Sequence, residues 1–464
     1  MAIDQKYYSC IEIISGLRKK EFSSLEITEH FLQKISTNEK LNAAAFINEE
    51  DVRQAARDAD VRLAKGDRAP LLGLPLSIKD SIAVKNWPWR SGSFARENVI
   101  AQEDATAVAR LRAAGAHFLC KTTVPEYTWS VETESAITGR TDNPFDTERT
   151  SGGSSGGEAV LHAVGGAPAG LGSDGLNSIR VPAHYCGTAG LRPTAGIVPE
   201  TGAWPTTRTS GLMDISTIGP MARSAADLAM LITTIEGYDG IDPFAHTLGN
   251  QKAFEKYDEV NIGYFLSHPI APASDDTQTA VKLAAGVLKA LGAKTQEISP
   301  WPIEQSVSLA FRLMAPDGGK QVRADVAAAQ GRHSQSFAVL IEQLRSQKLD
   351  IDEYLNAVSE FKAFRSLLRS AFNKFDAIIL PVAADSAPRH LASLASDESG
   401  LSIDEYSYSF AVALAGLPSV AVPVLKDRTG LPTGVQIVCK PHFDLVAIDF
   451  ATKIQEALNS FFLI

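Results

Sequence analysis

Two serines in glycine-rich stretches and one lysine at the end of an apolar run are the residues best suited to covalent chemistry in this chain. Ser178 lies in GSDGLNSIR, residues 172–180, and Ser154 lies in SGGSSGG, residues 151–157. A serine hydroxyl is a weak nucleophile until a neighbouring base removes its proton. No histidine stands within residues 172–180, so a base for Ser178 has to come from elsewhere in the chain.

Two common motifs compete to explain the stretch at 151–157. A phosphate-binding loop is disfavoured, because the stretch has neither the lysine of GxxxxGK[ST] nor the spacing of GxGxxG. A nucleophile elbow fits formally, since GGSSG satisfies GxSxG and His442 and Asp444 follow downstream. That motif needs a buried strand leading into Ser154, and the preceding DNPFDTERT does not have the composition of one.

Lys79 offers a third source of a base. It ends the apolar run GLPLSIK, which predicts an internal strand that holds the amine away from water. Burial disfavours the charged form of lysine, and a neutral amine can accept a proton. A lone lysine at a strand end is more often a solvated surface residue, so this hypothesis depends on what else the chain carries.

Long motifs of the chain resemble the amidase signature family of serine hydrolases. They are GLPLSIKDS, SGGSSGGEAV and GLGSDGLNSIRVPAHYCGTAGLRPT, in this order. Further similar stretches are KTTVPEYTWSVETESAITGRTDNPFDTERT, GLMDISTIGPMARSAADLAML and LAGLPSVAVPVLKDRTGLPTGVQIV, so the resemblance covers most of the chain except residues 240–375. The family includes fatty acid amide hydrolase, malonamidase, allophanate hydrolase and the A subunit of the tRNA-dependent amidotransferase.

The resemblance implies a Ser-cisSer-Lys triad. By position, Ser178 matches the nucleophile, Ser154 the bridging serine on a cis peptide bond, and Lys79 the base. In the implied mechanism, neutral Lys79 draws a proton through Ser154 from Ser178, whose oxygen attacks a carbonyl carbon. Water then releases the acyl-enzyme. We expect no cofactor and no metal.

The resemblance also implies an oxyanion hole built from the backbone amides of Gly175, Leu176, Asn177 and Ser178. The family pattern is close to GSDTGGSIR, whereas this chain reads GSDGLNSIR. Glycine allows positive φ and close approach to a ligand, asparagine tolerates positive φ, and leucine adopts it poorly. We therefore expect Leu176 and Asn177 to shape substrate selectivity, with an altered or impaired site as the alternative.

Four further residues are expected beside the triad. Asp174 and Arg180 flank the turn and are expected to fix it through hydrogen bonds or an ion pair; the alternative is that they are surface charges. Thr128 and Trp129, in PEYTWS, match positions that line the acyl pocket in relatives. Trp129 fits a plain core position equally well.

Substrate choice is expected to depend on the segment of weakest resemblance, including LAFRLMAPDGGK and FKAFRSLL. A buried Arg312 or Arg208 would suit an acidic substrate, whereas Trp204 favours an aryl or alkyl one. The predicted function is hydrolysis of a carbon–nitrogen bond in a small amide, with carbamates and esters as further options. The alternatives are the A subunit of a glutamine-dependent amidotransferase and a catalytically impaired binding protein of the same fold.

Helices and strands alternate in the elements that must position these residues. SSLEITEHFLQKI predicts a helix with a capping box between Ser23 and Glu26, and NEEDVRQAARDADVRLAKG predicts one that ends at Gly66. Apolar runs predict buried strands in LLGLPLSIKD, FDAIILPV and SVAVPVL. Residues 141–193 have the composition of a loop, and residues 301–375 are almost wholly helical in pattern.

These signals and the resemblance predict an α/β protein with the amidase signature fold. Its expected features are a large mixed central sheet, helices on both faces of that sheet, and a helical cap-like segment. We expect one domain over residues 1–464. Its parts are N-terminal helices at 1–65, a signature core with the catalytic residues at 66–240, a variable and largely helical substrate-side segment at 240–375, and core strands with a closing helix at 376–464.

Composition disfavours several other classes of protein. Hydrophobic residues make up 45% and charged residues 21% of the chain, which is typical of a folded protein with a large core. No stretch approaches the roughly 20 apolar residues of a membrane span, and the first residues do not read as a secretion signal, so we expect a cytoplasmic protein with no membrane partner. The net charge of -10 without a basic run disfavours nucleic acid. A homodimer stays open.

Overall fold

The structure is a computed structural model. It describes residues 8–204, 214–247, 249, 254–346, 348–392 and 403–462. Arg208, one of the two arginines considered for an acidic substrate, lies outside the described residues.

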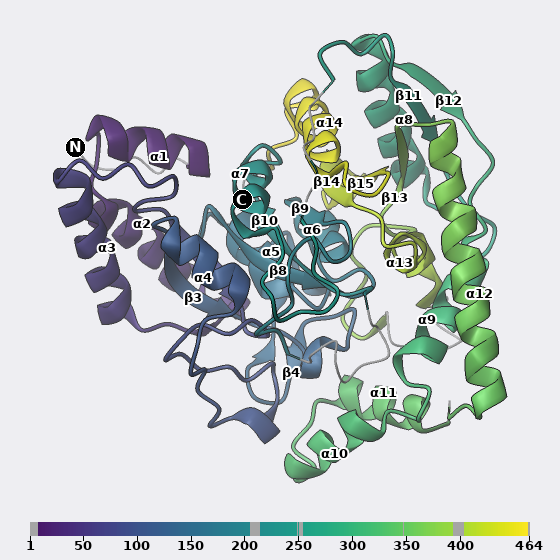
Figure 1. Ribbon diagram of the computed structural model, residues 1–464, viewed down its shortest axis with the longest axis horizontal. Coiled ribbons are helices and arrows are strands. Elements are labelled where there is room, and N and C mark those ends of the chain that lie inside the picture. The colour runs from purple at the N-terminus through teal and green to yellow at the C-terminus, as the bar shows by residue number, and fades with distance from the viewer. Residues whose placement is uncertain are drawn as a thin grey trace.

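A mixed sheet of 11 strands forms the centre of the molecule (Figure 1). In spatial order the strands are β1 (Ala44–Phe46), β3 (His117–Thr122), β2 (Pro75–Lys79), β8 (Ala169–Asp174), β10 (Thr217–Ala222), β9 (Ala189–Arg192), β14 (Ser419–Lys426), β15 (Pro432–Cys439), β13 (Ala377–Pro381), β11 (Asn261–Tyr264) and β12 (Lys294–Glu297). Strand β2 pairs in parallel with β3 and β8, and β11 pairs in parallel with β12 and β13. The other neighbours pair antiparallel, and the predicted mixed sheet is confirmed.

Helices cover both faces of this sheet, as predicted. The N-terminal helices lie to the left in Figure 1, and α12 runs along the right side. The helices are α1 (Cys10–Lys19), α2 (Ser24–Thr37), α3 (Glu49–Ala64), α4 (Thr106–Ala113), α5 (Gly156–Ala163), α6 (Arg180–Cys186), α7 (Asp227–Ile235), α8 (Asp275–Ala290), α9 (Ser306–Met314), α10 (Lys320–Ala328), α11 (Gln335–Ser346), α12 (Ile351–Ser370), α13 (Ser407–Leu414) and α14 (Asp444–Leu458).

Local sequence signals account for several of these elements. Ser23 Oγ accepts a hydrogen bond from the Glu26 amide at 3.1 Å, and Glu26 Oε2 accepts one from the Ser23 amide at 2.7 Å, so the predicted capping box begins α2. Gly66 follows α3 with a φ of 86°, in the left-handed region that glycine adopts without strain. The apolar runs that predicted strands form β2, β13 and β14.

The expectation of a long loop at residues 141–193 is wrong. The segment contains β7 (Asp146–Thr150), which pairs with β6 (Asp142–Asn143), and then α5, β8, α6 and β9. From residue 151 onward almost every residue is buried. A Cβ atom added at Gly170 would lie 2.3 Å from both Glu158 Oε2 and Ser77 Oγ, so small residues here permit close packing between elements. Composition alone does not separate this use of glycine from a flexible loop.

The helical pattern at 301–375 is confirmed by α9 to α12. Helices α10 and α11 lie at the bottom of Figure 1 and have an apolar cluster of their own, which is separate from the main core. That cluster, called here the second cluster, consists of Tyr127, Trp129, Ala315, Val322, Phe337, Ile341 and Leu344. Residues 240–375 also supply β11, β12 and α8 to the sheet layer.

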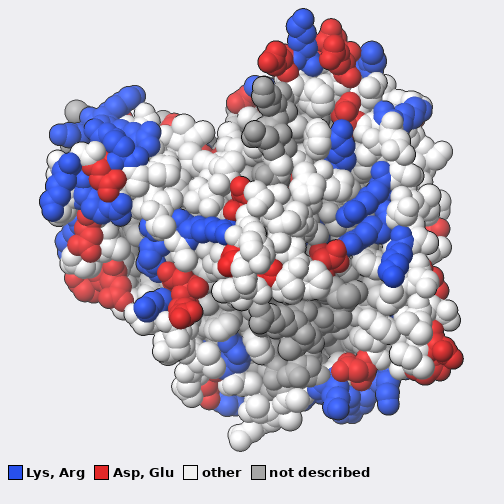
Figure 2. Space-filling view, viewed as in Figure 1, with Lys and Arg blue, Asp and Glu red and all other residues white. Residues whose placement is uncertain are grey.

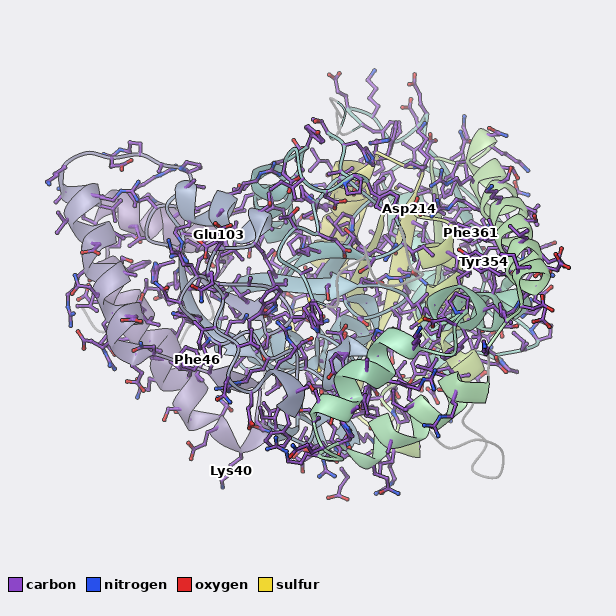
Figure 3. The ribbon with its side chains drawn as sticks, turned by 60° about the horizontal axis from the view of Figure 1, so that its bottom comes forward. Lys40, Phe46, Glu103, Asp214, Tyr354 and Phe361 are labelled. Carbon is purple, nitrogen blue, oxygen red and sulfur yellow. The ribbon has the colours of Figure 1, made fainter. Side chains whose placement is uncertain are left out.

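An ion pair attaches α12 to the rest of the molecule. Arg365 Nη1 lies 2.7 Å from Asp214 Oδ2, and the Arg365 guanidinium lies 4.6 Å from the centre of the Phe361 ring. Phe361 belongs to α12, and Asp214 lies in the same region of Figure 3.

Charged side chains of both signs are mixed on the visible face (Figure 2), and the thiols lie inside the molecule. Figure 2 shows acidic and basic side chains interspersed on one face, without a continuous basic stripe among the coloured residues. In the part of the chain that the structure describes, no helix has both the length and the hydropathy needed to cross a bilayer. Cys10, Cys120, Cys186 and Cys439 are free thiols, and all of them are buried.

Candidate active site

Strands β2 and β8 bring the candidate residues to one edge of the sheet. The two strands pair in parallel, so their carboxyl ends, at Lys79 and Asp174, point the same way. Open α/β sheets bind ligands beyond the carboxyl ends of their strands. The turn that follows β8 carries Ser178, and the turn before α5 carries Ser154.

Lys79 is buried in a ring of hydroxyl groups. Its Nζ donates hydrogen bonds to Ser154 Oγ at 2.7 Å, Ser155 Oγ at 2.8 Å and Ser173 Oγ at 3.0 Å. Burial lowers the pKa of Lys79 to about 7, although the negative charges of Asp174 and Glu158 act in the opposite direction. The charged and neutral amines therefore coexist near neutral pH, and the neutral amine is a competent base.

Ser154 is held in a tight backbone turn. The Gly153–Ser154 peptide bond is cis, and Gly152 has a φ of 78°. A Cβ atom at Gly153 would lie 2.6 Å from the Ser130 carbonyl oxygen, so only glycine fits there. The turn is thus fixed by backbone contacts, and it aims the Ser154 hydroxyl at Lys79.

Ser178 lies beside this turn and is 8% exposed. Its carbonyl oxygen accepts a hydrogen bond from the Ser155 amide at 3.1 Å, which joins the two serine-bearing turns. Among the described residues, the Ser178 hydroxyl donates no hydrogen bond, including none to Ser154. The structure brings Lys79 and Ser154 into contact and leaves Ser178 adjacent to them. Hydrogen bonds of a catalytic group are often long before the substrate binds, so this spacing is compatible with a role for Ser178.

Asp174 fixes the turn that carries Ser178 through buried hydrogen bonds. Its Oδ2 accepts hydrogen bonds from the Ile179 amide at 3.1 Å and from Arg180 Nε at 3.0 Å, and its Oδ1 accepts one from Arg192 Nη1 at 3.1 Å. Burial alone would raise the pKa of Asp174, but Arg180 and Arg192 outweigh burial and lower it to about 2. Both Asp174 and Arg180 have no exposed surface, so they are not surface charges.

Arg180 orients the backbone between Gly175 and Ser178. Its Nη2 donates to the Leu176 carbonyl oxygen at 2.5 Å. The next amide, that of Asn177, points away from Arg180, because the carbonyl and amide of a trans peptide point in opposite directions. Within the described residues, none of the four backbone amides from Gly175 to Ser178 donates a hydrogen bond inside the protein. Four successive free amides can bind an oxyanion.

The departure from the family pattern does not strain this turn. Neither Leu176 nor Asn177 is among the described residues with positive φ, so the backbone here does not require glycine. Leu176 is 8% and Asn177 is 3% exposed. Asn177 Nδ2 is buried and has no hydrogen-bond partner among the described residues, which leaves an amide donor unused next to Ser178.

Thr128 and Trp129 belong to a loop that includes a short 3-10 helix, Glu126–Thr128. Thr128 is partly exposed, with a φ of 62°. Trp129 is 8% exposed and packs in the second cluster with Ala315 and Phe337. The tryptophan therefore contributes to a core, and that core belongs to the helical segment expected to form the far wall of the pocket.

The elbow alternative is wrong, because its partners are engaged elsewhere. The carboxylate of Asp444 accepts hydrogen bonds from the Thr194 amide at 2.7 Å and from Thr194 Oγ1 at 2.6 Å. The ring of His442 lies against that of His246, with 5.0 Å between the ring centres. Ser154 instead contacts Lys79.

The residues considered for substrate charge have other contacts. Arg312 lies 2.5 Å from Glu360 Oε2 at the surface. Trp204 packs against the second cluster, and the Arg96 guanidinium lies 4.3 Å from the centre of its ring. The indole Nε1 of Trp204 has no hydrogen-bond partner among the described residues.

Comparison with known proteins identifies the family. A sequence model described as Amidase matches residues 26–445. The chain belongs to the Amidase family. The resemblance expected from the motifs is confirmed.

Curated relatives of this Amidase family member include two bacterial proteins, each named as the A subunit of glutamyl-tRNA(Gln) amidotransferase. The protein from Psychrobacter sp. (strain PRwf-1) is 30% identical over 95% of this chain and 94% of the relative. The protein from Roseiflexus sp. (strain RS-1) is 32% identical over 91% of each.

Solved structures with a similar fold include a protein described only as an amidase. It is 28% identical, with a TM-score of 0.84 over 97% of this chain and all 100% of that one. A structure from work on a vestigial protein complex and the origins of an s-triazine catabolic enzyme is also 28% identical, with a TM-score of 0.85 over 97% of this chain and 98% of its own. A bacterial aryl acylamidase shares the fold, at 23% identity and a TM-score of 0.86 over 98% of both chains.

Four residues of this Amidase site were not found from the sequence. Ser155 and Ser173 contact Lys79, Glu158 lies near it, and Arg192 contacts Asp174. All four lie inside the quoted motifs, Ser155 and Glu158 in SGGSSGGEAV and Ser173 and Arg192 in GLGSDGLNSIRVPAHYCGTAGLRPT. Their contacts with Lys79 or Asp174 depend on strand order and helix packing, which a single sequence does not reveal.

Proposed function

We propose that this member of the Amidase family cleaves a carbon–nitrogen bond through an acyl-enzyme on Ser178. The observation that carries the proposal is the contact of 2.7 Å between the buried amine of Lys79 and the Ser154 hydroxyl. A charged amine donates along this contact, whereas a neutral amine accepts from Ser154 across the same distance. The pKa of about 7 for Lys79 makes both directions accessible near neutral pH.

The proposed reaction begins with proton transfer. Neutral Lys79 accepts the proton of Ser154, which accepts that of Ser178, and Ser178 Oγ forms a bond to the carbonyl carbon of the substrate. The carbonyl electron pair moves to oxygen, where the free amides from Gly175 to Ser178 stabilise the negative charge. When the carbon–nitrogen bond breaks, the leaving nitrogen takes the proton back through Ser154. Water then attacks the acyl-enzyme by the same route and frees Ser178.

Asp174 and Arg180 support this chemistry without reacting. Together they fix the carbonyl of Leu176, and therefore the direction of the following amide. A donor in an oxyanion hole is typically worth about 3 kcal/mol of transition-state stabilisation. That value depends on alignment, so a buried ion pair that holds the turn contributes to rate as well as to stability.

The amidotransferase A subunit is the second candidate, and the curated relatives favour it over a free-standing hydrolase. Each match covers more than nine-tenths of this chain and more than nine-tenths of the relative. The acyl-enzyme step would be the same, with glutamine as the amide and ammonia as the leaving group passed to a partner protein. In that case the protein acts in a complex; a homodimer and a cytoplasmic location remain part of the proposal for a free-standing enzyme.

A catalytically silent binding protein is the third candidate, motivated only by Leu176 and Asn177. The contact of Lys79 with Ser154 and the free amides of the turn argue against it. Carbamates and esters stay within the proposed range of substrates, because both present a carbonyl carbon to the same nucleophile.

Two successive experiments separate the three candidates. The protein is treated with a fluorophosphonate probe, in which Ser178 Oγ displaces fluoride from phosphorus, and the labelled peptide is located by mass spectrometry. Labelling that is lost in Ser178→Ala supports an acyl-transfer enzyme, and unlabelled but folded protein contradicts it. A panel of glutamine, aliphatic amides, aryl amides and carbamates follows, in which preferential ammonia release from glutamine supports the amidotransferase candidate.

A further inference from the structure

The carboxylate of Glu126 joins two parts of the molecule that are far apart in the sequence. It is 1% exposed. Its Oε1 accepts hydrogen bonds from the Ala136 amide at 3.0 Å and the Ser334 amide at 2.7 Å, and its Oε2 accepts one from Ser334 Oγ at 2.7 Å. Removing a buried carboxylate that accepts three hydrogen bonds destabilises the fold, because the three donors are left without partners.

Ser334 directly precedes helix α11. Its Oγ accepts a hydrogen bond from the Phe337 amide at 3.3 Å, which is the geometry of an N-cap. The Glu126 carboxylate therefore lies at the beginning of α11, where a negative charge is favourable because the helix dipole is positive there. Glu126 thus holds the beginning of this helix by charge and by direct hydrogen bonds.

Apolar contacts hold the same two segments together. The rings of Tyr127 and Phe337 lie with their centres 5.4 Å apart, and Trp129 packs in the second cluster with Phe337 and Ile341. Tyr127 and Thr128 both have positive φ, at 56° and 62°. Such conformations persist only where the surroundings enforce them, and the contacts of Glu126 and Tyr127 supply that enforcement.

The loop that carries Thr128 and Trp129 continues to the turn of Ser154. A Cβ atom on Gly153 would lie 2.6 Å from the Ser130 carbonyl oxygen and 2.7 Å from the Glu132 amide nitrogen. Thr133 Oγ1 also donates to the Gly152 carbonyl oxygen at 2.8 Å. The loop therefore cannot move toward the Ser154 turn without contacting backbone atoms of that turn.

We propose that Glu126 is a positioning residue that fixes helix α11 to the loop of Thr128 and Trp129, and thereby determines how large an acyl group the site accepts. The inference rests on the proposed function, since it concerns the acyl side of that same site. The second cluster beside this loop is aromatic and aliphatic, so we expect the acyl group that fits best there to be apolar. Loosening α11 changes the fit of long acyl groups more than that of short ones.

The first test measures how firmly Glu126 holds α11, and it does not depend on activity. Amide hydrogen exchange of residues 335–346 is compared in wild type, Glu126→Ala and Ser334→Ala. We expect exchange to be about tenfold or more faster in Glu126→Ala, as follows from the loss of hydrogen bonds to a buried carboxylate. Ser334→Ala removes one of the three hydrogen bonds to Glu126 and also the N-cap hydrogen bond from the Phe337 amide, so its effect has the same direction.

Glu97 supplies the matched control. It pairs with Arg332 at 3.2 Å and ties the same helical segment to the core, but both side chains are well exposed, at 37% and 45%. Exposed pairs contribute little, so Glu97→Gln is expected to leave the exchange of α11 within about twofold of wild type. Equal acceleration in Glu97→Gln and Glu126→Ala would contradict a specific role for Glu126.

The second test measures specificity. Rates of labelling by fluorophosphonates with a short and a long alkyl chain are fitted to give KI and kinact for each probe. In Glu126→Ala we expect KI to rise about tenfold for the long probe, with kinact for the short probe within about threefold of wild type. Equal losses for both probes would overturn the proposal, as would unchanged exchange of α11. If Glu126→Ala does not fold, the same comparison is made with Ser334→Ala and Glu126→Gln.

The two proposals fail in different ways. Wild-type protein that folds but takes no label at Ser178 contradicts the proposed function. Hydrogen exchange of α11 then tests only whether Glu126 holds that helix. Wild-type protein that takes the label, with no difference between chain lengths in Glu126→Ala, leaves the proposed function intact and overturns the role of Glu126.

Discussion

The amine of Lys79 lies 2.7 Å from the hydroxyl of Ser154, and among the described residues no carboxylate lies within ion-pair distance of it. A buried lysine without an ion pair gains little from its positive charge. The hydroxyl groups around it can hydrogen-bond to either form of the amine. This arrangement favours proton exchange over permanent charge.

Removing the amine is expected to stop the chemistry without unfolding the protein. In Lys79→Ala, we expect the rate of amide cleavage and of Ser178 labelling to fall by about 10² to 10⁴, the usual contribution of a general base. Lys79→Arg should be equally inactive, because a guanidinium keeps its proton. Circular dichroism checks the fold, and labelling kinetics measure the loss. Near wild-type turnover in either variant would rule out Lys79 as the base.

Activity is expected to rise with pH through about 7. In the proposed mechanism the neutral amine is the base, and burial lowers the pKa of Lys79 from 10.5 to about 7, so the active form accumulates above that pH. The measurement is kcat/KM, or the labelling rate, between pH 5 and 9, with ionic strength held constant. A profile that is flat between pH 6 and 8 would contradict the lowered pKa.

The same lowered pKa is expected to make folding stability depend on pH. Between pH 7 and 10 the unfolded chain binds a proton at Lys79 that the folded chain does not, so the stability of wild type rises with pH. Relative to Lys79→Met, the free energy of unfolding should increase by about 1.4 kcal/mol per pH unit across that window. Urea unfolding at pH 7.5 and 9 measures it, and parallel values for the two proteins would contradict the prediction.

Asp174→Asn is expected to be strongly destabilising. The carboxylate contacts Arg180 and Arg192 with no exposed surface on any of the three, and breaking such a buried pair typically costs about 3 to 5 kcal/mol. We also expect slower labelling of Ser178, because the turn loses its anchor. Glu360→Gln, which breaks the surface pair with Arg312, serves as the control and should cost less than about 1 kcal/mol. Equal costs in the two variants would contradict the assignment.

Asn177 and Asn143 form a matched pair. Asn177 Nδ2 has no partner among the described residues, whereas Asn143 Nδ2 donates to the Thr150 and Tyr185 carbonyl oxygens, both at 3.0 Å. Asn143→Ala should therefore lower the free energy of unfolding by about 2 kcal/mol or more, and Asn177→Ala by less than about 1 kcal/mol. Asn177→Ala should instead change the ranking of amide substrates. An unchanged ranking would remove Asn177 from the substrate site.

The sequence was most informative where chemistry and local pattern coincide. Lys79 at the end of an apolar run predicts a buried amine, and the structure places it in contact with Ser154. The capping box of α2 and the strands β2, β13 and β14 followed from periodicity and turn signals alone.

Contacts between distant elements could not be predicted in this way. Arg192 reaches Asp174 because β9 lies two strands from β8 in the sheet, on the far side of β10. Glu126 and Ser334 are 208 residues apart, and nothing local to either residue indicates the other. The prediction of a loop at residues 141–193 was wrong for a different reason, because glycine and serine occur in closely packed segments as well as in flexible loops.

The separation of the second cluster from the main core has a consequence for how such proteins diversify. The cluster around Phe337 and Trp129 has its own packing, and among the described residues only Phe311 and Met314 pack against both it and the main core. Substitutions in α10 and α11 can therefore repack one small core while the sheet that carries Lys79 and Ser178 stays undisturbed. A lineage with this architecture can acquire a new substrate by changing its helices and inherit its reaction unchanged.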